Sequence, residues 1–171
     1  REMVRRHALI RRLASVETLG SATVICTDKT GTLTQNEMTV TRIWADDHFF
    51  EVTGSGYSPK GDFLLDGKTV NVHDYRAAAH TLWVGVLNND AALEALPSEN
   101  GAHAYRMIGD PTEGSILVTA AKAGAVTPAL LEAYPRKDEI PFDSSRKRMV
   151  TLHTVDQPDP RDLSPFYDQN G

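Results

Sequence analysis

The chain has 171 residues, of which 40% are hydrophobic and 24% are charged, so it can form a sizeable core in one domain or in one domain and part of another. Its formal net charge of −5 argues against general nucleic-acid binding, and we expect no nucleic-acid partner. A single cysteine excludes an internal disulfide, and no apolar run of about 18 residues or signal-peptide pattern is present, so we expect the chain by itself to be soluble.

The first predicted element is a helix over residues 1–14, followed by a turn over residues 15–20. Five arginines fall within the first twelve residues, opposed only by Glu2. Such a cluster is typical of a juxtamembrane stalk on the cytoplasmic side of a membrane, because positive residues favour that side. The alternative is a solvated basic helix of a soluble protein.

The next predicted element is a buried strand of the parallel type at residues 22–27, which are rich in β-branched residues and place Cys26 in the core. Ligands of open α/β sheets lie at the carboxyl ends of strands, where this run is followed by Asp28. A carboxylate at this position can attack a phosphoryl group and form an acyl phosphate. Lys29 would offset developing negative charge, and the hydroxyl of Thr30 can donate to phosphate oxygens. Asp28 is therefore the predicted nucleophile.

The heptapeptide Asp28-Lys29-Thr30-Gly31-Thr32-Leu33-Thr34 resembles the signature of the P-type ATPases, ion pumps that pass through a phosphoaspartate. The resemblance implies that residues 21–40 are the first strand and phosphorylation loop of a haloacid-dehalogenase-like domain. It also implies ATP and Mg²⁺ as ligands, with the metal on the Asp28 carboxylate and the Thr30 carbonyl. Related haloacid-dehalogenase phosphatases usually have a second, proton-transferring aspartate where this chain has Thr30. Because threonine cannot transfer that proton at neutral pH, we expect slow phosphoenzyme hydrolysis, as a pump requires.

Residues 41–171 are predicted to form an α+β nucleotide-binding domain, an antiparallel sheet flanked by helices, which we expect to be incomplete at its C-terminal end. Strands are predicted at 38–44 and 48–52 with a turn at Asp46-Asp47, and a second tight hairpin at Asp66-Gly67. The glycine-rich residues 53–61 fail the Walker phosphate-loop pattern and are interpreted as a structural turn.

Helices and strands are predicted to follow one another in the second half of the domain. A core helix at 75–88 carries Trp83 as a packing residue rather than a cofactor-stacking one. The other predictions are a loop at 97–101, a strand at 104–108, helices at 111–123 and 129–134, strands at 138–142 and 148–155, and a linker or mobile loop at 156–171.

A helix start at residues 109–114 contains the second candidate motif. Asp110 suits the N-cap, Pro111 the first helical position and Glu113 the capping box, so a purely structural role is the simple reading. Residues 107–117 also resemble the nucleotide-domain motif of type II P-type ATPases, whose glutamate binds the adenine amino group. The resemblance implies that role for Glu113.

Residues 139–149 are the third match to this family. Phe142 would offer a flat face for adenine, and Lys147 a cation for the phosphates, roles that the resemblance implies for both. The alternative is a core phenylalanine and a solvated basic hairpin. Animal sarcoplasmic-type calcium pumps have an arginine where this chain has Ser144, and either Arg146 or Arg148 is a candidate to replace it.

Taken together, these motifs predict the cytoplasmic ATP-binding part of a bacterial, calcium-class P-type pump. Its expected partners are ATP, the transported cation, and the membrane and actuator domains of the same pump, at the cytoplasmic face of a membrane. The family's Lys-Gly-Ala, Thr-Gly-Asp and Gly-Asp-Gly segments are absent from the sequence, so we expect an excerpt that does not turn over alone. A small haloacid-dehalogenase-type phosphatase and a non-catalytic ATP-binding module remain the alternatives.

Overall fold

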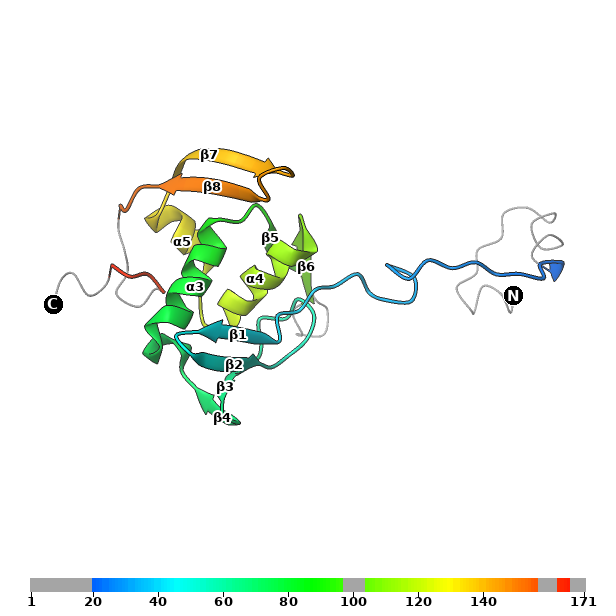
Figure 1. Ribbon diagram of the computed structural model, residues 1–171, viewed down its shortest axis with the longest axis horizontal. Helices are drawn as coiled ribbons and strands as arrows, with labels where there is room; N and C mark the ends of the chain where they lie inside the picture. The colour runs from blue at the N-terminus through cyan, green and yellow to red at the C-terminus, as the bar shows by residue number, and fades with distance from the viewer. Residues whose placement is uncertain (1–19, 97–103, 157–162, 167–171) are drawn as a thin grey trace. The chain divides into compact units, whose positions relative to one another are not determined.

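The structure is a computed structural model that describes residues 20–96, 104–156 and 163–166 (Figure 1). The chain divides into two compact units, Arg1–Asn36 and Glu37–Gly171. The predicted stalk helix, most of the turn after it and the loop at 97–101 lie outside the described residues.

The first unit is described over residues 20–36, and the predicted buried strand at 22–27 is wrong for this structure. These residues have no strand assignment, Val24 and Ile25 are 76% and 85% exposed, and Cys26 is exposed rather than in the core. A strand of the parallel type needs hydrogen-bonded neighbours on its edges, and the described residues offer none to this run. Among the described residues, the expected phosphorylation-domain sheet is therefore not formed.

The second unit begins with a four-stranded antiparallel meander in the order β1–β2–β3–β4. Its strands are β1 (Arg42–Ala45), β2 (His48–Val52), β3 (Phe63–Leu65) and β4 (Lys68–Val70). Both predicted tight turns are confirmed, because Asp46-Asp47 and Asp66-Gly67 are the two-residue loops of hairpins and all four residues have positive φ. The first strand is shorter than predicted and starts at Arg42 rather than residue 38.

Two helices pack on one another against this sheet and form the core with it. After the short 3-10 turn η1 (Val72–Asp74), α3 spans Arg76–Leu87 and α4 spans Pro111–Lys122, each within one residue of its prediction. A Cβ added to Gly85 of α3 would lie 2.5 Å from the Ile116 side chain of α4, so the glycine permits the close approach of the two helices. Phe50, Leu82 and Leu117 are buried in this core.

Two further hairpins and a short helix complete the described fold (Figure 1). They are β5 (Ala92–Leu96) with β6 (Ala104–Ile108), α5 (Thr127–Ala133), and β7 (Arg136–Asp143) with β8 (Arg148–His153). The mixed, antiparallel fold class is confirmed, but the described residues form three separate sheets rather than one. No single helix among them is long and apolar enough to cross a membrane, and α4 and α5, which meet the length and composition criteria only as a pair, are bent by 93°.

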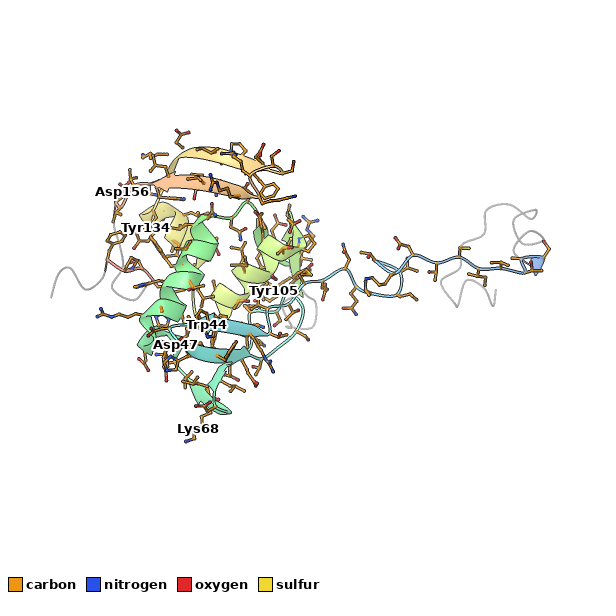
Figure 2. All side chains as sticks on the ribbon, viewed as in Figure 1. Trp44, Asp47, Lys68, Tyr105, Tyr134 and Asp156 are labelled. Carbon is orange, nitrogen blue, oxygen red and sulfur yellow. The ribbon has the colours of Figure 1, made fainter. Side chains whose placement is uncertain are left out.

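Trp83 is confirmed as a packing residue, and its neighbours correct the prediction for the chain's last segment. Its ring lies 5.3 Å from that of Tyr134 and 6.0 Å from that of Phe166 (Figure 2 labels Tyr134). Leu163 and Ser164 are buried as well, so residues 163–166 are not part of a mobile loop. The apolar side chains of Leu163 and Phe166 anchor a segment whose proline and aspartate content alone predicts a linker.

Candidate functional site

Asp28 begins a tight turn in the first unit. Its Oδ1 accepts a hydrogen bond from the Lys29 amide at 2.7 Å, and the Lys29 carbonyl accepts from the amides of Leu33 and Thr34 at 3.0 and 3.1 Å. Gly31 has a φ of +72°, a conformation that glycine adopts without strain. The turn therefore presents an exposed carboxylate whose other oxygen is not used in this contact.

Glu113 lies in the first turn of α4, and its carboxylate reaches the segment that follows α3. Its Oε2 accepts a hydrogen bond from the Asp90 amide at 3.3 Å, while its backbone carbonyl accepts from Asn89 Nδ2 at 3.0 Å. Asn89 also donates to the Gly85 carbonyl and accepts from the Ala91 amide. Since Asn89 is buried with both ends of its amide paired, it fixes the C-terminal end of α3 to the start of α4.

Arg136 joins the β7–β8 hairpin to the same segment, a role that the sequence analysis missed. Its guanidinium donates to Asp90 Oδ1 at 2.6 Å and Glu139 Oε2 at 2.8 Å, and to the carbonyls of Leu87 and Asn89 at 3.2 and 2.8 Å. The hydrogen bond to Asp90 raises the pKa of Arg136, so the group stays charged. The only available signal was the polar run after the predicted helix, which does not identify a partner.

The turn of the β7–β8 hairpin contains Lys147, and the two candidate arginines, Arg146 and Arg148, differ in their contacts there. Asp143 Oδ1 accepts from the amides of Ser145 and Arg146 at 3.0 and 2.8 Å, and the Arg146 side chain lies 3.7 Å from the same oxygen. Lys147 donates its amide to the Asp143 carbonyl at 2.7 Å and has a positive φ of 53°. Arg146 is thus engaged within the turn, whereas the Arg148 side chain makes no hydrogen bond or ion pair with another described residue.

One face of this hairpin is apolar and open. Along β8, residues with exposed side chains alternate with half-buried ones, so Arg148, Val150 and Leu152 share the exposed face. Val150 pairs with Ile140 of β7, and Phe142, two residues along β7, is 62% exposed. The prediction that Phe142 is available for stacking is therefore compatible with its surroundings, and its core alternative is wrong.

The candidate residues of the second unit lie on two elements. Glu113 is tied to Asp90 and through Asp90 to the start of β7, whereas Phe142, Lys147 and Arg148 lie at the other end of the hairpin. No hydrogen bond, ion pair or ring contact joins Glu113 to those three within the described part of the chain. Likewise, within residues 20–96, 104–156 and 163–166, no group of three acidic, histidine or cysteine side chains is arranged to hold a metal.

Asp110 caps α4 and gives a testable pH dependence. Its Oδ1 accepts from the Thr112 amide at 2.7 Å, and this hydrogen bond lowers the pKa of the Asp110 carboxyl from its ordinary value of 3.8. The carboxylate therefore adds stability above pH 3.8, and this contribution is lost as the pH falls through the lowered pKa. We expect urea unfolding between about pH 5 and 2 to reveal a steeper loss of stability in the wild type than in Asp110→Asn, which keeps a neutral cap. Parallel pH profiles would contradict this role.

Comparisons with known proteins agree with the motifs. The family model described as "P-type ATPase, cytoplasmic domain N" matches residues 77–164, just over half of the chain. A cation-transporting ATPase of Synechocystis sp. is 44% identical over 165 residues, and the calcium-transporting ATPase of Bacillus subtilis is 41% identical over 150 residues. The human calcium-transporting ATPase type 2C member 1 is 40% identical over 161 residues.

These alignments cover 90%, 88% and 92% of this chain but only 17%, 16% and 16% of the three relatives. The chain thus spans about a sixth of the length of the curated relatives it matches. The matched residues 77–164 contain α3 except its first residue, α4 and the β7–β8 hairpin, and with them Glu113, Phe142, Lys147 and Arg148. The chain belongs to the P-type ATPase family.

Proposed function

We propose that this chain is the cytoplasmic ATP-binding part of a cation-transporting pump, in which ATP held by the second unit phosphorylates Asp28. The observation that carries the proposal is the match of residues 77–164 to cytoplasmic domain N. The names of the relatives, cation-transporting and calcium-transporting ATPases, favour a cation of the calcium class as cargo. The remaining partners would be the membrane and actuator domains of the same pump, at the cytoplasmic face of a membrane.

ATP would be held by groups that protein contacts leave available. The exposed ring of Phe142 provides a face for adenine, and the second carboxylate oxygen of Glu113 can accept from the adenine amino group. Lys147 in the hairpin turn and Arg148 at the start of β8 supply positive charge for the phosphates. Arg146 is the weaker candidate because its side chain is engaged by Asp143.

Phosphoryl transfer would use the exposed carboxylate of Asp28. One carboxylate oxygen forms a bond to the γ-phosphorus while the bond from that phosphorus to the oxygen bridging to the β-phosphate breaks, and ADP leaves with the electron pair. Lys29 is adjacent to offset the charge. Thr30 offers no proton-transferring carboxylate, which favours a lasting phosphoenzyme over the phosphatase alternative.

The oxygen donors at Asp28 suit Mg²⁺. This ion binds proteins through one or two carboxylates, with the substrate phosphates and water completing its shell. The Asp28 carboxylate and the Thr30 carbonyl would hold it, and when bound it neutralises phosphate charge. Among the described residues, no group of three acidic, histidine or cysteine side chains is arranged to hold a metal. Together with the absence of a strand at 22–27, this favours ATP binding without turnover for the isolated chain.

The test of ATP binding is a titration of the chain with ATP, followed by NMR shifts or fluorescence. We expect Phe142→Ala to weaken binding by about 1 to 3 kcal/mol, because base stacking on an aromatic ring is lost. Phe49→Ala is a matched control, since Phe49 is also an exposed strand phenylalanine, 64% exposed against 62% for Phe142. Equal affinity in the wild type and both variants would remove Phe142 from the proposed site.

A further inference from the structure

The glycine-rich loop at residues 53–61, which the sequence predicts to be a structural turn, is closed by a lysine from a distant helix. Lys122, in the last turn of α4, donates from Nζ to the Thr53 carbonyl at 2.7 Å and to the Gly54 carbonyl at 3.4 Å. No ion pair of Lys122 with a carboxylate occurs among the described residues. Burial lowers the pKa of the Lys122 ammonium. A partly buried cation directed at two backbone carbonyls holds those carbonyls in place.

The two ends of the loop form a narrow neck at this lysine. The Thr53 amide donates to the Asp62 carbonyl at 3.0 Å, and the Asp62 amide donates to Thr53 Oγ1 at 2.7 Å. A Cβ on Gly54 would lie 2.3 Å from the Lys60 carbonyl oxygen, and one on Gly61 would lie 2.3 Å from the Thr53 carbonyl oxygen. Both glycines are therefore required by the close approach of the backbone.

The far part of the loop holds the segment by which the chain enters the second unit. The Gly56 amide donates to Thr39 Oγ1 at 3.3 Å, and a Cβ on Gly56 would lie 3.0 Å from Glu37 Oε2. Tyr57 lies close enough to Glu37 that the carboxylate adds to the effect of burial in raising the tyrosine pKa. Residues 37–39 are the first residues of the second unit, three positions after Thr34 in the sequence, so this contact holds the start of that unit against the loop.

Helix α4 connects this anchor to the proposed adenine contact. Glu113 lies in its first turn and Lys122 in its last, a separation of nine residues or about 14 Å along a rigid helix. The helix is buried over much of its length, with Leu117, Val118 and Ala120 in the interior. The core therefore holds α4 independently of Lys122, so loss of the contact at its last turn leaves Glu113 in place.

We propose that Lys122 is a positioning residue for phosphoryl transfer, because it fixes residues 37–39, the start of the nucleotide-binding unit, through loop 53–61. This inference rests on the proposed function. It predicts that loss of the lysine impairs the transfer step and leaves ATP affinity intact, because Lys122 contacts backbone carbonyls at the chain entry and none of the proposed nucleotide contacts.

The test compares Lys122→Met with the wild type in the full-length pump. Equilibrium ATP affinity is measured in an Asp28→Asn background, which prevents phosphorylation, and the rate of phosphoenzyme formation in a single turnover at saturating ATP. We expect the rate to fall by about 10- to 100-fold, the effect of a misplacement near 1 Å, with ATP affinity changed less than about twofold. Lys122→Arg should recover most of the rate, because a guanidinium can donate to the same carbonyls.

Two further variants keep the result decisive. Thr39→Val removes the acceptor for the Gly56 amide outside α4, and it should reproduce the slow transfer even if Lys122→Met fails to fold. Lys68→Met is the matched control, because Lys68 is exposed at the tip of the β3–β4 hairpin (Figure 2) and should not matter. An unchanged rate in Thr39→Val, or parallel losses of affinity and rate in Lys122→Met, would overturn the inference. Failure of wild-type ATP binding or phosphorylation would instead overturn the proposed function.

Discussion

Replacement of Asp28 by asparagine is expected to abolish phosphoenzyme formation in the full-length pump, a loss of about a thousandfold or more, because no other group replaces an attacking carboxylate oxygen. The amide of asparagine is isosteric but is a poor nucleophile at the γ-phosphorus. The Lys29 amide can still donate to the asparagine carbonyl, as it does to Asp28 Oδ1 at 2.7 Å, so the turn is retained. The measurement is an acid-stable, hydroxylamine-labile label from γ-labelled ATP.

Two controls separate chemistry from folding in this experiment. Asp47→Asn changes an exposed aspartate in the β1–β2 turn (Figure 2), where a positive φ of 58° also suits asparagine, and should leave the label unchanged. ATP affinity of Asp28→Asn should match or exceed that of the wild type, since a negative charge near the phosphates is removed. A label that persists in Asp28→Asn would assign the phosphoryl group to another residue.

Local patterns predicted the elements of the second unit well. The two hairpin turns, α3 and α4 depend on signals carried by neighbouring residues, namely positive-φ turn residues and apolar side chains at helical spacing. β5 was missed because residues 91–96, rich in alanine and leucine, have the composition of a helix, and only pairing with β6 makes them a strand. The strand predicted at 22–27 is wrong for the reverse reason, since its composition favours a strand but none of the described segments pairs with it.

Residues of the candidate site could be predicted where they belong to a short sequence motif. They could not be predicted where only tertiary contacts define their role. Glu113, Phe142 and Lys147 were identified from short local patterns, and their roles as nucleotide contacts stay predictions. Arg136 and Lys122 have no such pattern, because their partners lie 46 and 69 residues away in the chain. Their roles depend on which backbone carbonyls the fold brings near them, which a single sequence does not specify. The choice between Arg146 and Arg148 likewise needed the turn geometry at Asp143.

Arg136 is the side chain whose loss we expect to destabilise the second unit most. Its guanidinium makes four hydrogen bonds while only 24% exposed, and its removal leaves the carboxylate of Asp90 and the carbonyls of Leu87 and Asn89 without these donors. We expect Arg136→Met to lower the free energy of unfolding by about 2 to 3 kcal/mol, measured by urea unfolding followed by tryptophan fluorescence. Because the pKa of Arg136 is raised, its contribution to folding stability is fully present at every pH below the ordinary arginine pKa. The stability lost in Arg136→Met should therefore be the same at every pH between about 6 and 9.

The matched control is Arg42→Met, since Arg42 is 69% exposed and lies 3.7 Å from Glu51 in a surface pair that should contribute less than about 1 kcal/mol. The loss of stability in Arg136→Lys should lie between the losses in Arg42→Met and Arg136→Met, because an ammonium cannot reach four acceptors in the planar arrangement of a guanidinium.

ATP affinity should fall in Arg136→Met as well, although Arg136 is not a proposed nucleotide contact. The reason is that Asp90 connects Arg136 to Glu113, so releasing the hairpin frees both sides of the proposed pocket. Equal stabilities of Arg136→Met and Arg42→Met would mean that the hairpin is held by packing rather than by this guanidinium.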